Sequence, residues 1–205
     1  ELGAKIYLPS GYLNIAVFDQ EIKGFQSNTF IGTGFVLANA GTQSVDGYEF
    51  DLLFSPTENI DIAIGGTFID PIYDSFTGSA FGDLSGTTPS NIPDDTLSSS
   101  VTWTWDRNGW DGYVRLSHLY SSKAVLTENP EAQALLESKG NGFREQDTLN
   151  FSAGMQKDNL SISVWGKNIN DDEFIQTAFN VPGSDAQAAY PAPGAIYGLT
   201  VAKEF

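Results

Sequence analysis

The stretch TLSSSVTWTW, residues 96–105, decides the fold class of this chain. Leu97, Val101 and Trp103 fall on one face of an extended chain. Ser98, Ser100 and Thr102 fall on the other face. Alternation of this kind is typical of a β-strand that has one apolar and one polar face. The same period of two recurs along the whole sequence, whereas helical periodicity is nearly absent. The sequence therefore predicts an all-β protein.

The alternation and the turn residues between the alternating segments predict about nine strands in an antiparallel meander. The expected strands are at about 1–8, 12–26, 36–55, 60–70, 94–105, 112–123, 145–157, 160–172 and 194–205. Tight connections such as Pro56–Asn59 alternate with longer ones at 27–35, 71–93, 124–144 and 173–193. We expect the longer connections to lie together at one end of the sheet. Residues 130–137 begin with proline and are good helix formers, so they predict a short helix.

Composition excludes several classes of function. The 205 residues suit one domain or part of a larger one, and their net charge of −16 argues against nucleic acid as a partner. The absence of cysteine excludes disulfides, thiolate metal sites and cysteine nucleophiles. A single histidine, His118, is too few for a histidine-rich metal site and makes a histidine-based catalytic triad implausible. We expect neither an enzyme nor a cofactor.

An alternating meander has two interpretations. A soluble β-sandwich buries its apolar faces in a core, whereas a transmembrane β-barrel turns them toward lipid. The polar faces here contain serine, threonine, glycine, asparagine and acids, with few lysines to shield a soluble sheet. Aromatic residues such as Trp103, Trp110 and Tyr120 are near strand ends, as in the aromatic girdles of membrane barrels. These features favour the barrel and leave the sandwich as the alternative.

Several segments resemble the TonB-dependent outer-membrane receptors. They are LNIAVFDQEIKGF (13–25), NAG (39–41) followed by VDGYEFDL (45–52) and SPTEN (55–59), SVWGKNINDDEF (163–174), and PGAIYGLTVAKEF (193–205). The resemblance implies that residues 1–205 are the C-terminal portion of a 22-stranded barrel in the outer membrane of a Gram-negative cell. Short turns would then be periplasmic and long loops extracellular. The plug domain and the earlier strands would lie outside this chain.

The same resemblance implies active uptake of a scarce ligand, most often a ferric siderophore or another metal complex. The partners it implies are the remaining strands and plug of the same receptor, the TonB–ExbB–ExbD complex, the barrel-assembly machinery and outer-membrane lipid. Because the loops are acidic, a highly anionic complex would be repelled unless cations screen it. A diffusive porin and a soluble carbohydrate-binding sandwich are the alternative functions.

Two sets of residues are candidates for function. Aromatic side chains in the long connections can stack on a ligand or pack the loops themselves; they are Tyr73, Phe76, Phe81, Phe179 and Tyr190. The closing strand ends in an aromatic residue, and by resemblance its alternate residues form a signal for barrel assembly; they are Tyr197, Leu199, Val201 and Phe205.

The charged residues have structural interpretations. The segment 171–173 (Asp-Asp-Glu) and the pair Asp94 and Asp95 carry the oxygen ligands that Ca²⁺ prefers, but solvated strand ends explain both better, and we expect no metal site. Acids on the polar faces would line the lumen and help hold the barrel to its plug, with two basic residues as possible partners; the five are Glu49, Asp51, Asp61, Arg115 and Lys167. His118 is expected on the lipid face as an interfacial residue.

Overall fold

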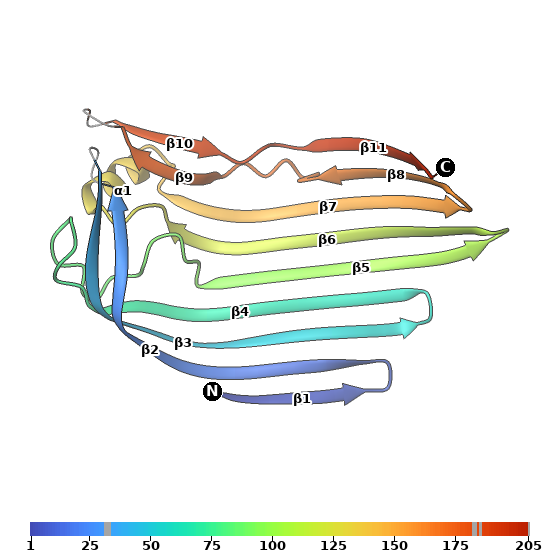
Figure 1. Cartoon of the computed structure of the whole chain (residues 1–205), viewed down its shortest axis with the longest axis horizontal. Helices are drawn as coiled ribbons and strands as arrows, with labels where there is room; N and C mark the ends of the chain where they lie inside the picture. Colours follow the sequence, from blue (N-terminus) through green and yellow to red (C-terminus); the bar gives the residue numbers. More distant parts are fainter. Residues whose placement is uncertain (31–33, 182–183, 185, 205) are drawn as a thin grey trace.

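The computed structural model describes residues 1–30, 34–181, 184 and 186–204. These residues form a nine-stranded antiparallel sheet, in the order β1-β2-β3-β4-β5-β6-β7-β8-β11, and a separate two-stranded sheet of β9 and β10 (Figure 1). The strands of the large sheet are β1 (Leu2–Leu8), β2 (Gly11–Phe30), β3 (Phe35–Thr57), β4 (Ile60–Ser75), β5 (Asp95–Arg107), β6 (Trp110–Val125), β7 (Phe143–Lys157), β8 (Leu160–Lys167) and β11 (Ile196–Lys203). The small sheet pairs β9 (Ile175–Asn180) with β10 (Gln187–Pro191).

The nine-strand meander predicted from the sequence is confirmed, with three differences in detail. Strands β2 and β3 continue further toward each other than expected, and β8 stops at Lys167 instead of residue 172. The connection at 173–193 contains the β9–β10 hairpin, which the sequence analysis missed. The expected helix is present as α1 (Pro130–Ser138), and the Asn129 side chain caps it by accepting hydrogen bonds from the backbone of Glu131 and Ala132.

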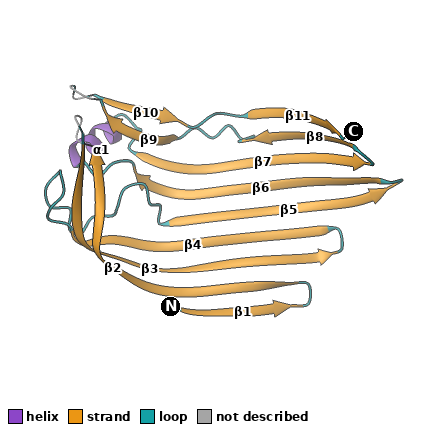
Figure 2. Cartoon of the chain, viewed as in Figure 1, coloured by secondary structure: helices purple, strands orange, loops and turns teal. Residues whose placement is uncertain are grey.

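The connections separate by length at the two ends of the sheet (Figure 2). At one end β-turns join neighbouring strands, as at Asn108 and Gly109, whose φ angles of 59° and 73° suit a tight hairpin turn. At the other end lie α1, the β9–β10 hairpin and the connection between β4 and β5 (Figure 2). Among the described residues, no helix combines the length and the apolar composition that crossing a bilayer requires.

The strand register joins the alternating residues into two continuous faces. Ile62 lies opposite Val101, which lies opposite Leu116, which lies opposite Phe151. One residue further along each strand, the neighbouring row on the polar face consists of Ala63, Ser100, Ser117 and Asn150. Because side chains in a strand alternate between faces, every strand contributes apolar residues to the same side of the sheet.

The apolar face of the sheet is uncovered. Val101, Leu116 and Leu199 keep 42%, 41% and 66% of their surface exposed. The buried apolar residues instead lie at or near the long-connection end, and those described are Tyr73, Phe76, Leu84, Ala124, Leu126, Ala132, Leu136 and Ala178. A soluble sandwich would bury its sheet faces and expose its loops. The observed distribution is the reverse, which is the arrangement of a sheet that meets lipid.

Candidate functional site

The first part of the candidate site is an aromatic cluster at the long-connection end of β4. Tyr73 and Phe76 meet edge to face, with ring centroids 4.9 Å apart, and Leu84 packs beside them. Phe25 of β2 completes the cluster, 6.1 Å from the Tyr73 ring. Tyr73 and Phe76 are each only 1% exposed, so in this structure they pack the connection and offer no ring face to a ligand.

A single carboxylate, that of Glu128 in the connection between β6 and α1, bridges the ends of β2 and β4 beside this cluster. Glu128 accepts a hydrogen bond of 2.6 Å from the Tyr73 hydroxyl and one of 3.2 Å from the Ser27 hydroxyl. Burial raises the pKa of Tyr73 above its ordinary value, and the hydrogen bond and charge of Glu128 act in the same direction. The sequence analysis missed Glu128 because a lone acid in a loop has no distinguishing pattern.

A second cluster fixes α1 against the β9–β10 hairpin. Leu126, Leu136 and Ala178 are buried together, and Ile175 packs against them. The side chain of Gln133 satisfies the backbone on both sides of the helix: its Oε1 accepts from the Leu126 amide at 3.1 Å, and its Nε2 donates to the Gly142 carbonyl at 2.6 Å. The hairpin therefore rests on an ordered support, although it does not belong to the large sheet.

The hairpin presents two of the predicted ligand-contact residues to solvent. Phe179 and Tyr190 are 39% and 60% exposed, and their ring centroids are 5.6 Å apart at an angle of 30°. Their neighbour Ala178 points into the buried cluster, as alternation along β9 requires. Phe81, in the connection between β4 and β5, is half-buried. The structure thus leaves open rings at Phe179 and Tyr190 and a partly open ring at Phe81.

The acids after β8 have structural partners. Asp172 accepts the backbone N–H of Asp147 at 2.7 Å, and Asp171 accepts that of Ala195 at 2.8 Å. At the other predicted acidic pair, partial burial and the charges of Asp95 and Asp70 raise the pKa of Asp94. No group of three or more metal-ligating side chains occurs in the described part of the chain.

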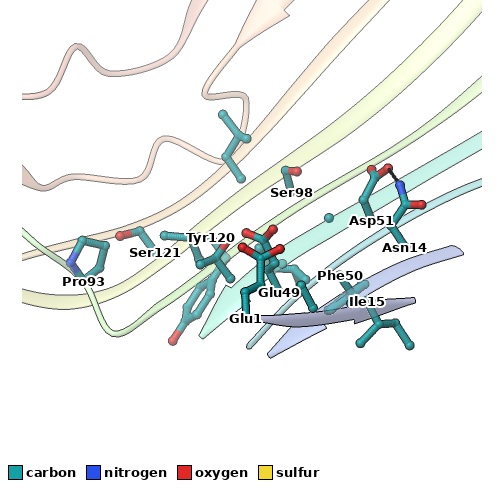
Figure 3. A pocket seen from close by; sticks show the side chains of 18 of the residues that line it. Glu1, Asn14, Ile15, Glu49, Phe50, Asp51, Pro93, Ser98, Tyr120 and Ser121 are labelled. Carbon is teal, nitrogen blue, oxygen red and sulfur yellow. Dashed lines mark hydrogen bonds between the residues drawn. The ribbon is translucent and has the colours of Figure 1, made fainter. Parts of the chain in front are cut away.

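The second part of the candidate site is a hollow of about 940 Å³ on the polar face of the sheet. Figure 3 shows Asn14, Asp51 and Ser98 on one side of the strands and Ile15 and Tyr120 on the opposite side. Glu49 and Arg144 also line the hollow. The hollow is therefore lined by both polar and apolar side chains and contains charges of both signs.

The charged residues of the polar face have neutral partners. Asp51 accepts from Asn14 at 3.3 Å, and Asp61 accepts from Ser55 at 2.6 Å. The Arg115 guanidinium donates to the Thr102 hydroxyl at 3.0 Å. The Lys167 ammonium lies 5.8 Å from the centre of the Trp165 ring. None of the ion pairs found among the described residues joins these acids to Arg115 or Lys167.

The remaining predicted residues lie on the apolar face. His118 lies opposite Ser99 and Leu149 in the sheet, and its Nε2 is 2.5 Å from a carboxylate oxygen of Asp147. On the closing strand, Tyr197, Leu199 and Val201 are 67%, 66% and 60% exposed. Phe205, the last residue of the predicted assembly signal, lies outside the described residues.

Comparison with solved structures finds the same fold in receptors for ferric complexes. The ferric yersiniabactin receptor FyuA from Yersinia pestis is similar over 99% of this chain and 29% of its own, with 19% identity and a TM-score of 0.75. The ferric preacinetobactin receptor BauA from Acinetobacter baumannii is similar over 99% of this chain and 28% of its own, with 16% identity and a TM-score of 0.66. The ferric-catecholate import receptor Fiu from Escherichia coli K12 is similar over 96% of this chain and 25% of its own, with 17% identity and a TM-score of 0.65. The chain thus spans less than a third of each receptor.

Comparison with curated proteins gives no match. The family model for the β-barrel of TonB-dependent receptors, in contrast, matches residues 1–169. This match covers most of the chain and includes β1 to β8, and it agrees with the uncovered apolar face and the connections gathered at one end. It decides for a β-barrel and against the soluble sandwich. The chain belongs to the β-barrel family of TonB-dependent receptors.

Proposed function

We propose that this chain is the C-terminal portion of the barrel of an outer-membrane receptor for active ligand uptake. The observation that carries the proposal is the distribution of buried residues in this member of the barrel family. The apolar face of the sheet is uncovered, the opposite face is polar and has a hollow, and the buried clusters lie at or near the connections at one end. A barrel wall needs such faces to separate lipid from a polar lumen. In this orientation the long connections are extracellular and the tight turns periplasmic.

The proposal includes partners that act on the two faces. The plug of the same receptor would fill the lumen against the hollow lined by Glu49 and Asp51, and the TonB–ExbB–ExbD complex would act through that plug. The exposed residues of β11 would be recognised by the barrel-assembly machinery; they are Tyr197, Leu199 and Val201, with Phe205 following them in sequence.

We further propose a ferric siderophore or similar metal complex as the ligand class. The similar structures are receptors for ferric yersiniabactin, ferric preacinetobactin and ferric catecholates, which supports the choice. The net charge of −16 favours a weakly charged complex over a highly anionic one. Phe81, Phe179 and Tyr190 are the residues proposed to touch the ligand, because their rings are at least partly open.

The test is uptake by the receptor at its full length. A strain that lacks the receptor should grow poorly under iron limitation on one member of a panel of ferric siderophores, and the receptor gene should restore growth. The panel should include cobalamin and oligosaccharides. If only one of these depends on the receptor, the receptor function stands and the metal-complex class is wrong. If no nutrient depends on the receptor, the uptake proposal itself fails.

Removing the open rings should weaken ligand binding. Each of Phe179→Ala and Tyr190→Ala is expected to raise the Kd about 2- to 10-fold, the usual worth of one aromatic stacking contact. Tyr7→Ala is the matched control, because its ring is 79% exposed and lies beside the tight turn between β1 and β2, at the opposite end of the sheet from the hairpin. Titration of the purified receptor with the ligand found in the growth assay measures the effect. Equal Kd values for all three variants would remove Phe179 and Tyr190 from the site.

A further inference from the structure

On the apolar face of the large sheet, the apolar and aromatic residues form a band that crosses the strands obliquely. Residues of this face that lie directly opposite one another on neighbouring strands make up a row. On β2, β3 and β4 the band ends toward the long connections at Val17, Tyr48 and Phe68, which share one row. On β5 it ends one row closer to the tight turns, at Leu97, and on β7 it ends one row closer again, at Leu149.

An acidic side chain comes next on the same face of these five strands. On β2, β3 and β4 the three acids lie directly opposite one another, whereas the acid of β5 is one row closer and that of β7 two rows closer to the tight turns. The line of acids therefore runs parallel to the edge of the band. Charged side chains avoid the hydrocarbon of a bilayer, so such a line is the expected limit of a lipid-facing surface. The five acids are Asp19, Asp46, Asp70, Asp95 and Asp147.

The band also has the height of a hydrocarbon layer. It extends from Ile60 to Phe68 on β4 and from Leu97 to Trp105 on β5. Either length is about 26 Å at the rise of an extended strand, and the outward apolar band of membrane barrels is about 25 Å tall. The lower edge descends as the upper one does, because Trp105 lies one row beyond the row in which Ile60 is opposite Trp103. The two edges therefore enclose a slab of nearly constant height.

One ionisable residue lies inside the band and fits the same line. Among the acidic and basic residues that the structure describes on this face, only His118 falls within the band, opposite Ser99 and Leu149. Its Nε2 is 2.5 Å from a carboxylate oxygen of Asp147, one of the acids at the edge. Polar groups in a membrane pair with one another, and side chains near a boundary reach toward it. The histidine is therefore joined to the boundary instead of being isolated in the apolar band.

We propose that the line of acids is the outer boundary of the hydrocarbon layer and that the five acids lie in the headgroup layer just outside it. From β2 to β7 the line shifts by four residues over five strand spacings, which is about 13 Å against about 24 Å. The strands therefore stand about 30° from the membrane normal, close to the tilt of about 35–45° in membrane barrels. The inference rests on the proposed outer-membrane location and adds the depth of each residue.

The test measures depth in the full-length receptor, reconstituted in phosphatidylcholine vesicles. Residues 1–205 contain no cysteine, so one introduced cysteine carries the fluorescent label once any cysteine elsewhere in the receptor is replaced by serine. Lipids with a nitroxide at the headgroup or deep in the acyl chain quench labels at the corresponding depth. Phe50→Cys and Asp147→Cys lie in one row, yet the label at Phe50 should be about 10 Å deeper. Asp46→Cys lies two rows from Asp147→Cys, yet both labels should be equally shallow.

Two further variants control for folding and for the face of the sheet. Ile15→Cys lies in the same row as Phe50 and gives a second deep position if Phe50→Cys folds poorly. Ser117→Cys lies on the polar face, and neither nitroxide lipid should quench its label. The heat-dependent electrophoretic shift of folded barrels shows that each labelled receptor has folded.

The outcomes separate this inference from the proposed function. Equal depths at Phe50 and Asp147, with Asp46 at a different depth, would mean that the membrane boundary follows a row of the sheet, and the oblique boundary would be wrong. If neither nitroxide lipid quenched the labels at Phe50 and Ile15, the apolar face would not meet lipid at all. That result would overturn the proposed membrane location itself.

Discussion

Asn168 lies directly after the last residue of β8, and its backbone has a φ of 50°. Its side chain is 7% exposed and makes three hydrogen bonds to backbone groups: it accepts from the Asp172 amide and donates to the carbonyls of Asp172 and Pro193. Asparagine tolerates this φ better than most residues and offers both a donor and an acceptor. One residue therefore ends the strand and stabilises the turn that follows it.

The segment after Asn168 continues the contact with β7 through side chains. Asn170 accepts from the Leu149 amide at 2.8 Å and donates to the Asp147 carbonyl at 2.6 Å, and Asp172 accepts from the Asp147 amide. The sequence predicted a strand to residue 172 because this segment does stay beside β7. The sequence could not show that after Lys167 side chains make most of the bonds to β7 and the backbone keeps one, from the Ile169 amide to the Leu149 carbonyl, because these bonds depend on partners distant in sequence.

Asn168→Ala should destabilise this turn. Three partly buried hydrogen bonds to backbone groups are lost, and at a net worth of roughly 0.5–1.5 kcal/mol per bond a total of about 2–4 kcal/mol is expected. Hydrogen exchange should show faster exchange of the Asp172 amide in the variant. Asn141→Ala is the control, because Asn141 is exposed and makes a single long side-chain bond to Lys139. Equal protection of Asp172 in both variants would contradict the role given to Asn168.

At the scale of strands, glycines lie under aromatic rings of the neighbouring strand. A Cβ added to Gly198 would lie 2.2 Å from Trp165, one added to Gly112 would lie 2.2 Å from Trp105, and one added to Gly154 would lie 2.7 Å from Tyr113. Each glycine pairs directly with the residue whose ring covers it. Such pairs let a large ring lie flat on the sheet, which offsets the poor strand propensity of glycine.

Gly198→Ala should therefore disturb the pairing of β8 and β11. The Trp165 ring must move, and its Nε1 would lose the hydrogen bond of 3.3 Å to Thr200. Overpacking of this kind costs about 1–3 kcal/mol, so the thermal midpoint of the folded barrel should fall by several degrees. Gly3→Ala is a matched control, because its Cβ would meet ordinary contacts at 3.4 Å or more. Trp165→Ala in the Gly198→Ala background should relieve the clash; failure to do so would indicate another cause.

At the scale of the molecule, the sequence predicted the sheet better than the connections. Alternation is a local signal, so residues such as Val101 and Ser100 reveal their faces without knowledge of the fold. The burial of Tyr73 is not local, because it requires Phe25 of β2 to meet Leu84 and Glu128 from two different connections. Aromatic residues in a loop sequence look the same whether they pack or bind. The exposed pair Phe179 and Tyr190 became distinguishable from Tyr73 only in the structure.

The opposite environments of the two faces give the last prediction. Val101 lies in mid-sheet on the apolar face between Ile62 and Leu116, and Ser100 lies next to it on the polar face between Ala63 and Ser117. If the apolar face meets lipid, Val101→Arg should cost about 2–4 kcal/mol, the price of a cation at the bilayer midplane, and should lower the amount of folded receptor in the outer membrane.

Ser100→Arg places the same charge one residue away on the polar face, where both opposite residues are neutral, and it should preserve folding. The two variants are compared by the amount of folded receptor in isolated outer membranes, which is measured from its heat-dependent electrophoretic mobility. A sheet with water on its apolar face would accept a cation at either position, because Val101 is already 42% exposed in this chain. Normal folding of Val101→Arg would therefore show that water, and not lipid, covers the apolar face.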